Sequence, residues 1–142
     1  MSSTIERMNV VLANANVLFT KLHNYHWNVK GPAFFQLHAK TEEYYTLFAT
    51  MYDDVAERIL QLEGTPLVTL KTILGTATIE EESKVEFSVE YILKSIISDF
   101  QEMQSHFKAI SADEHTDDIT RAYSDEQIGF IEKELWMLKS SM

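Results

Sequence analysis

An unbroken helical pattern over residues 35–62 constrains the fold most. It predicts one long helix with two apolar faces, each of which must pack against a different partner. One apolar stripe recurs at steps of three and four residues: Tyr44, Phe48, Met51, Val55, Ile59 and Leu62. A second face, rotated by roughly 80–120°, carries Tyr45, Ala49, Tyr52, Ala56 and Leu60. Because one core needs only one stripe, the second face predicts a contact with another subunit.

The chain has few breaks, with four glycines and two prolines in 142 residues, and this favours long helices over a turn-rich β fold. Apolar stripes predict three more long helices, at about residues 4–30, 88–110 and 117–138. Residues 63–87 form a long connection, in which residues 67–74 predict a short helix. Such a connection would let the second and third long helices run in the same direction, as in ferritin-like bundles. We therefore predict an all-α, ferritin-like four-helix bundle with a long crossover, as one domain over residues 1–142.

Two pairs of candidate metal ligands lie on the helix predicted at residues 35–62, too far apart to share one ion. His38 and Glu42 stand one turn apart, and so do Asp53 and Glu57. Asp53 comes fifteen residues after His38, which is roughly 22 Å along a helix. All four side chains nevertheless fall within an arc of roughly 100°. A second, antiparallel copy of the helix about a two-fold axis would bring each pair against the copy's other pair.

His26 joins this set because the apolar stripe of the first helix leads to it. The stripe passes through Leu12, Ala15, Phe19 and Leu22. Imidazole nitrogens with carboxylate oxygens, without sulfur, suit Fe(II), Mn(II) or Zn(II). Taken alone, each histidine is more often structural and each acid more often solvated. The placement of both pairs beside the second apolar face favours a metal site shared between subunits.

The rival arrangement is a di-iron site within one chain. It would need Glu-x-x-His on each of two helices and two further glutamates, and the sequence contains no Glu-x-x-His. Glu102 and His106 stand one turn apart, but nothing pairs with them, so we interpret them as a surface ion pair. The missing motif favours the shared site.

Composition and charge restrict the partners. The formal net charge is −10 and the sequence pI about 4.8, so the surface repels DNA phosphates and anionic lipids and attracts cations. Some DNA-binding proteins use a lysine-rich tail, whereas here the first seven residues contain only Arg7 and the last four only Lys139 as cations. There is no cysteine, no basic-then-apolar leader and no run of 18 apolar residues. We expect a cytoplasmic protein without membrane contact and with weak DNA binding at most.

Two motifs at a characteristic separation carry a family resemblance. Residues 21–38 read KLHNYHWNVKGPAFFQLH, and residues 53–58 read DDVAER. They resemble the two signatures of the Dps family of ferritin-like mini-ferritins, and the similarity extends over nearly the whole chain. It is similar above all to the acidic, bacterioferritin-like, neutrophil-activating branch.

The resemblance implies a dodecameric hollow shell with a ferroxidase site at each two-fold interface. His26, His38 and Glu42 would come from one subunit, and Asp53 and Glu57 from its mate. Fe(II) would be oxidised there, preferably by hydrogen peroxide rather than dioxygen, and stored inside as ferric oxide, which protects against oxidative stress. Many members of that family have aspartate where this sequence has Glu42. The glutamate side chain is longer, so it keeps the negative charge but places the carboxylate oxygens differently.

Two further features each have two interpretations. The family places Trp27 near the iron, where it would take up stray oxidising equivalents or simply pack the interface. The acidic turn that contains Asp113, Glu114, Asp117 and Asp118 would cap a helix, since carboxylates favour helix N-termini. The resemblance points instead to a three-fold cation pore lined by Asp117 or Asp118.

Two other functions compete with the ferroxidase. The first is a non-catalytic metal-binding or interaction shell, in which the second apolar face serves assembly only and the ligands hold a structural ion or none. Peroxide consumption per added Fe(II) separates it from an enzyme. The second is a nucleoid-compacting protein, which the negative charge disfavours.

Overall fold

The computed structural model describes residues 2–142, and all regular structure in that range is helical. The elements are α1 (Ser2–Asn28), α2 (Phe34–Gln61), α3 (Leu70–Thr76), α4 (Val89–Ala112) and α5 (Asp118–Ser140). Each long helix begins and ends within two residues of its predicted position, so the all-α prediction is confirmed. Over the same range, no helix combines the length and hydrophobicity that crossing a membrane requires.

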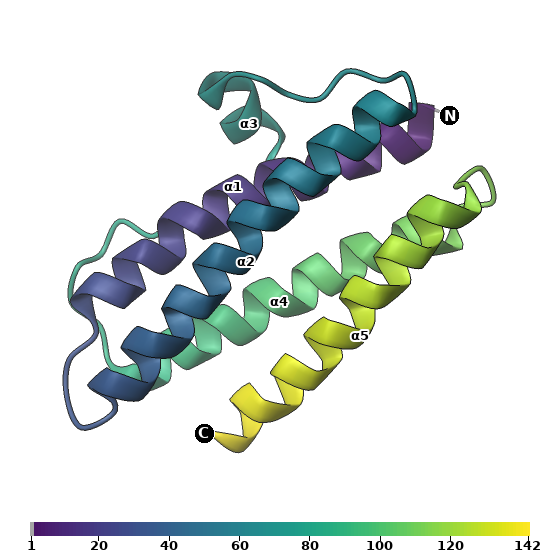
Figure 1. Ribbon diagram of the computed structural model, residues 1–142. Coiled ribbons are helices and arrows are strands. Elements are labelled where there is room, and N and C mark those ends of the chain that lie inside the picture. The colour runs from purple at the N-terminus through teal and green to yellow at the C-terminus, as the bar shows by residue number, and fades with distance from the viewer. Residues whose placement is uncertain (1) are drawn as a thin grey trace.

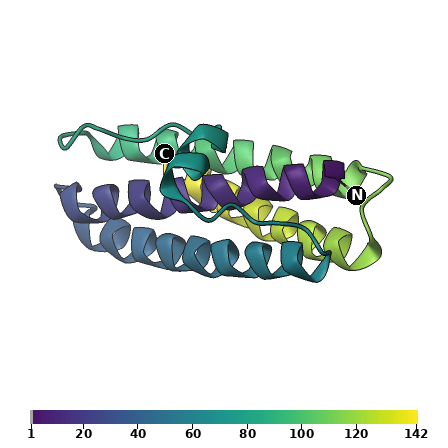
Figure 2. The ribbon, with the colours of Figure 1, turned by 90° about the horizontal axis from the view of Figure 1, so that it is seen from above.

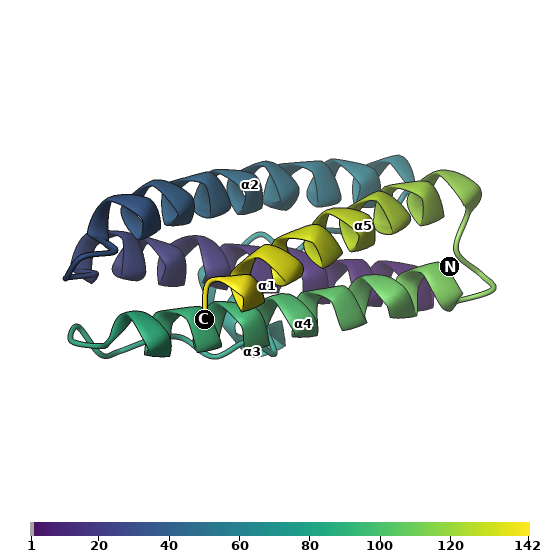
Figure 3. The same ribbon diagram turned by 90° about the horizontal axis from the view of Figure 1, so that it is seen from below.

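The long helices form two antiparallel hairpins, α1 with α2 and α4 with α5 (Figure 1). The hairpins pack through α1 and α4, while α5 lies between α2 and α4 on the opposite side from the crossover (Figure 3). The crossover runs back along α1 and places α3 against it (Figure 2). As a result α2 and α4 run in the same direction, as the long connection predicted.

The predicted stripe of α2 provides the centre of the core. Tyr44, Phe48 and Val55 are each at most 2% exposed, and the ring of Phe100 from α4 meets those of Tyr44 and Phe48 edge-on at 4.8 and 5.6 Å. Burial of such aromatic side chains dominates the stability of a bundle of this size. Phe19 is an exception to the predicted stripe of α1, because it is 37% exposed at the edge of the α1–α2 hairpin.

A buried polar cluster joins α1 to α4 beside the end of the first hairpin. Lys21 Nζ lies 2.8 Å from the Asp99 carboxylate, and burial raises the pKa of Asp99 although Lys21 opposes the shift. One turn later, the Tyr25 hydroxyl lies 2.8 Å from Ser95 Oγ and donates to the Glu82 carboxylate at 2.9 Å. These contacts fix the last turns of α1 on its neighbours, and His26 follows directly.

Three asparagines of α1 hold the crossover, which has little regular structure of its own. Near the start of the crossover, Asn9 Oδ1 accepts from the backbone N–H of Leu67 at 3.1 Å. Near its end, Asn24 Nδ2 donates to the carbonyl of Lys84 at 2.8 Å. Backbone groups that lack ladder partners must be bonded by side chains or water. The third asparagine, Asn14, does this in the middle, where no water reaches it.

Asn14 is 0% exposed and bonds both backbone and side chain of the crossover. Its Oδ1 accepts from the N–H groups of Thr78 and Ile79 at 2.8 and 3.0 Å, and its Nδ2 donates to Thr78 Oγ1 at 3.0 Å. Every polar atom of the amide is therefore used, and Ile79 is drawn into the core at 4% exposure.

We predict that Asn14→Ala loosens the crossover while the long helices persist. It leaves the N–H groups of Thr78 and of the buried Ile79 without their side-chain acceptor, which costs about 2 kcal/mol. Hydrogen exchange at these two amides should become at least about tenfold faster. The control is Asn9→Ala, since Asn9 bonds an exposed part of the crossover. Unchanged exchange at both amides in Asn14→Ala would contradict the role given to Asn14.

Candidate metal centre

His26 and His38 face each other where α1 ends and α2 begins. Their rings stack with centroids 3.7 Å apart and planes 15° from parallel. Each Nδ1 donates to the main-chain carbonyl of the other residue, His26 to His38 at 2.6 Å and His38 to His26 at 2.8 Å. The carbonyl of His26 belongs to the last turn of α1, where no intrahelical donor follows. The exchange therefore ends one helix and orients two imidazoles at once.

This exchange fixes which ring nitrogen is free. With the proton on Nδ1, Nε2 of each histidine carries the lone pair that binds a metal. Glu42 Oε1 lies 4.0 Å from His26 Nε2, so of the predicted ligands His26 contacts both His38 and Glu42. His26 is buried and the Glu42 side chain 60% exposed, so the carboxylate forms the outer edge of the group.

Asp53 and Glu57 lie elsewhere on α2. Both are exposed, and the hydrogen bond and charge of Asp53 raise the pKa of Glu57. Such a pair of adjacent carboxylates is relieved by a cation placed between them. Within residues 2–142, no three His, Asp or Glu side chains of one chain are close enough together to hold a metal ion. The predicted set is thus divided between two places on one helix.

An aromatic cluster extends from His26 over the second face of α2. The half-buried Tyr45 ring meets His26 edge-on at 5.2 Å and stacks on His23 at 3.7 Å. Phe19 and Trp27 contact His23 from either side along α1, at 4.6 and 5.4 Å. Sequence reasoning assigned no role to His23, although its spacing of four from Phe19 and Trp27 would have placed the three on one face. Trp27 itself is 67% exposed.

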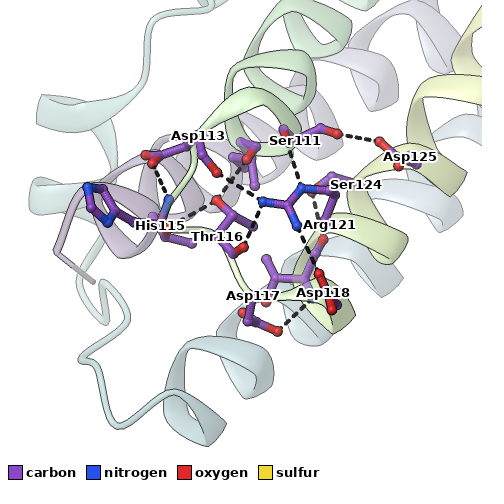
Figure 4. A network of polar contacts seen from close by, with 12 residues as sticks. Ser111, Asp113, His115, Thr116, Asp117, Asp118, Arg121, Ser124 and Asp125 are labelled. Atoms are coloured by element: carbon purple, nitrogen blue, oxygen red, sulfur yellow. Dashed lines mark hydrogen bonds and ion pairs between the residues drawn. The ribbon is translucent and has the colours of Figure 1, made fainter.

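Two aspartates of the acidic turn were predicted as pore residues, and their surroundings differ (Figure 4). Asp117 caps α5, since its Oδ2 accepts from the Thr120 N–H at 3.0 Å and pairs with Arg58 at 2.7 Å. Burial raises the pKa of Asp117, but the bonds from Thr120 and Arg58 outweigh this and hold it at about 2. Asp118 is 99% exposed and pairs with Arg121 at 3.1 Å. The capping interpretation holds for Asp117, and the pore remains a prediction.

Arg121 organises the backbone of this turn. Its guanidinium donates to the carbonyls of Ser111, Asp113 and Thr116 at 2.9, 3.1 and 2.8 Å (Figure 4). The last carbonyls of α4 are therefore satisfied by a cation, which a helix C-terminus favours. Sequence reasoning missed this role, because a lone arginine early in a helix carries no local signal of which carbonyls it binds.

The predicted surface pair is also present. His106 Nε2 lies 3.3 Å from Glu102 Oε2, and Thr78 Oγ1 lies 3.0 Å from the same nitrogen. The hydroxyl of Thr78 also donates to Glu102. These contacts tie α4 to the crossover, and they involve none of the predicted ligands.

Known proteins are similar to this chain over nearly its whole length. The chain matches the ferritin-like domain family over residues 5–142. It is 43% identical to the DNA protection during starvation protein of Helicobacter pylori over 141 residues, with 98% of each chain covered. It is 41% identical to general stress protein 20U of Bacillus subtilis, over 96% of this chain and 94% of the relative.

Solved structures agree as well. The Dps protein from Bacillus brevis superposes with a TM-score of 0.93 at 38% identity, covering 98% of this chain and 94% of that one. Dps from Vibrio cholerae, described as a member of a broad superfamily of ferritin-like diiron-carboxylate proteins, superposes with a TM-score of 0.92 at 32% identity, covering 98% and 88%. Since fold, family match and relatives agree over nearly the full length, the chain belongs to the Dps family of ferritin-like proteins.

Proposed function

We propose that the protein is a ferroxidase that assembles into a dodecameric shell and stores the oxidised iron inside it. The observation that carries the proposal is the exchange of bonds between His26 and His38, which leaves Nε2 of both imidazoles free to bind a metal, with that of His26 4.0 Å from Glu42. Metal-binding histidines characteristically donate their other N–H to a carbonyl or carboxylate. Both imidazoles have that arrangement, because each Nδ1 donates to a main-chain carbonyl.

Each site is proposed to be shared between two subunits. His26, His38 and Glu42 are one half, and Asp53 and Glu57 are the other, roughly 22 Å further along α2. In two chains related by a two-fold axis, the first half of each chain would meet the second half of the other, which gives two identical sites. Such a contact, made by the same surface of both chains, is isologous. The partly exposed face of Tyr45, Ala49, Tyr52, Ala56 and Leu60 lies between the halves and would form the contact.

Iron is the substrate of this site. The carboxylates of Glu42, Asp53 and Glu57 are hard donors that favour Fe(III) over Fe(II), whereas neutral His26 and His38 keep the total charge modest. Hydrogen peroxide is the preferred oxidant in this proposal; each molecule accepts one electron from each of two Fe(II) and leaves as water after taking up protons. The product hydrolyses to ferric oxide within the shell. The absence of cysteine fits a reducing compartment, so we place the activity in the cytoplasm.

Replacement of both His26 and His38 with alanine should slow Fe(II) oxidation by hydrogen peroxide at least about tenfold, because the nitrogen ligands are lost. The measurement is stopped-flow absorbance of ferric product, with peroxide consumed per Fe(II) and native mass determined on the same sample. The matched control is His106→Ala, which removes an imidazole from the surface pair. Equal rates in the double variant and the wild type would refute the assigned ligands, and no peroxide consumption by the wild type would favour a non-catalytic shell.

Mixed shells test whether the site is shared. We expect shells of His26→Ala/His38→Ala alone, and of Asp53→Asn/Glu57→Gln alone, to be inactive. Random co-assembly of the two in equal amounts should restore about one quarter of the wild-type sites, because half of the two-fold pairs are mixed and each mixed pair holds one intact site. A site built within one chain would recover no activity on mixing.

Asp118 is the better candidate for guiding cations through a three-fold pore, because its side chain is 99% exposed despite its pair with Arg121, whereas Asp117 is 37% exposed, caps α5 and pairs with Arg58. Asp118→Asn should slow iron uptake at low Fe(II), and added salt should reduce the difference from wild type, since screening weakens the attraction of exposed charges. Glu86→Gln, an equal change of charge on the exposed crossover, is the control. If both variants take up iron equally fast, Asp118 does not guide it.

Weak DNA binding is part of the same proposal, although several of the relatives are named for DNA protection. Each phosphate contact needs a cation, and the chain carries 12 Lys and Arg against 22 Asp and Glu. A gel shift with duplex DNA at physiological salt and neutral pH should give no complex below about 1 µM shell. A salt-sensitive complex at nanomolar concentration would contradict this expectation.

A further inference from the structure

Thr41 lies behind His26, on the side away from the proposed metal. It is 0% exposed and sits on α2 one turn after Leu37. Its hydroxyl donates to the Leu37 carbonyl at 2.6 Å, as helical threonines commonly do. The same oxygen also lies 3.3 Å from His26 Nδ1 and 3.1 Å from the His38 carbonyl. A hydroxyl used only for its own helix would not need to face an imidazole.

The protons in this cluster can be assigned by counting donors. Thr41 has one hydroxyl proton, and the Leu37 carbonyl takes it through the shortest contact of that oxygen. His26 Nδ1 lies 2.6 Å from the His38 carbonyl, which can only accept, so Nδ1 must carry a proton. The lone pairs of Thr41 Oγ1 then face that N–H as a second acceptor. Both acceptors favour the same tautomer of His26.

We propose that Thr41 is a positioning residue for the metal centre. Its hydroxyl holds the plane of the His26 ring from behind, so that Nε2 points towards Glu42 and the proposed metal position. The inference rests on the proposed function in that it takes His26 as a ligand. Groups that hold a ligand's second nitrogen in this way typically change metal affinity by 10–100-fold when they are removed.

The alternative is that Thr41 only fills space between α1 and α2. Two substitutions separate the hydroxyl from the volume. Thr41→Val keeps the shape and the branched Cβ but puts a methyl group against the imidazole N–H. Thr41→Ser keeps the hydroxyl and removes the methyl group, which leaves a small cavity. A packing role makes serine the worse variant, whereas a positioning role makes valine the worse one.

The test is an anaerobic titration of the assembled shell with Co(II), a probe that reports ligand geometry through its visible absorption without iron oxidation. We expect Thr41→Val to weaken Co(II) binding at least about tenfold and to alter the spectrum, with native mass unchanged. Thr41→Ser should bind as the wild type does, even where its thermal midpoint is lower. Thr50→Val, at an exposed position of the same helix, controls for the added valine.

The outcomes separate this inference from the proposed site. If Thr41→Val binds Co(II) as well as the wild type, the role of Thr41 is wrong and the proposed centre is unaffected. The same holds if Thr41→Ser loses as much Co(II) binding as Thr41→Val. If His26→Ala leaves the Co(II) spectrum of the wild type unchanged, His26 is not a ligand, and the proposed centre falls together with the inference. If His26→Ala and Thr41→Val lose Co(II) binding while Thr41→Ser retains it, both the proposed centre and the role of Thr41 are supported.

Discussion

Two imidazoles that bond each other's backbone hold together the part of this protein on which the rest depends. His26 and His38 join the last turn of α1 to the first turns of α2, through bonds of 2.6 and 2.8 Å. Each bond uses Nδ1 of one ring, and the bond from His38 gives the carbonyl of His26 a donor at the end of α1. The contacts that close the first hairpin are therefore the same ones that leave Nε2 of both proposed ligands free. The buried cluster around Lys21 and Asp99 supports this hairpin from α4.

The crossover shows a second use of polar groups. A segment with one short helix has many backbone donors and acceptors, and Asn9, Asn14 and Asn24 of α1 bond them at three successive points. Asparagine suits this task because its amide offers both a donor and an acceptor. In this way α1 carries the proposed ligand His26 at its end, core side chains on one face, and the attachment of the crossover on another.

Periodicity was sufficient to predict the long helices, because burial of stripes such as that around Phe48 decides where helices lie. It also placed His26 correctly on a buried face and failed for Phe19, whose ring contacts His23 and Tyr45 instead of the core. The proposed ligands can be named from residue types at helical spacing, and they remain a prediction. The carbonyl partners of the imidazoles and the position of Thr41 could not be predicted, since they depend on how closely two helix ends approach, which no local pattern encodes.

A carboxylate that is ionised usually also attracts cations, but in the Arg58–Asp117 pair these two properties do not go together. Bonds from Thr120 and Arg58 together hold the pKa of Asp117 at about 2, and the Arg58 guanidinium also balances its negative charge. A cation in solution near the α4–α5 turn would therefore gain less from Asp117 than from Asp118, whose side chain is 99% exposed although it pairs with Arg121. The contacts that keep Asp117 ionised thus also reduce the attraction that its charge exerts on a metal ion.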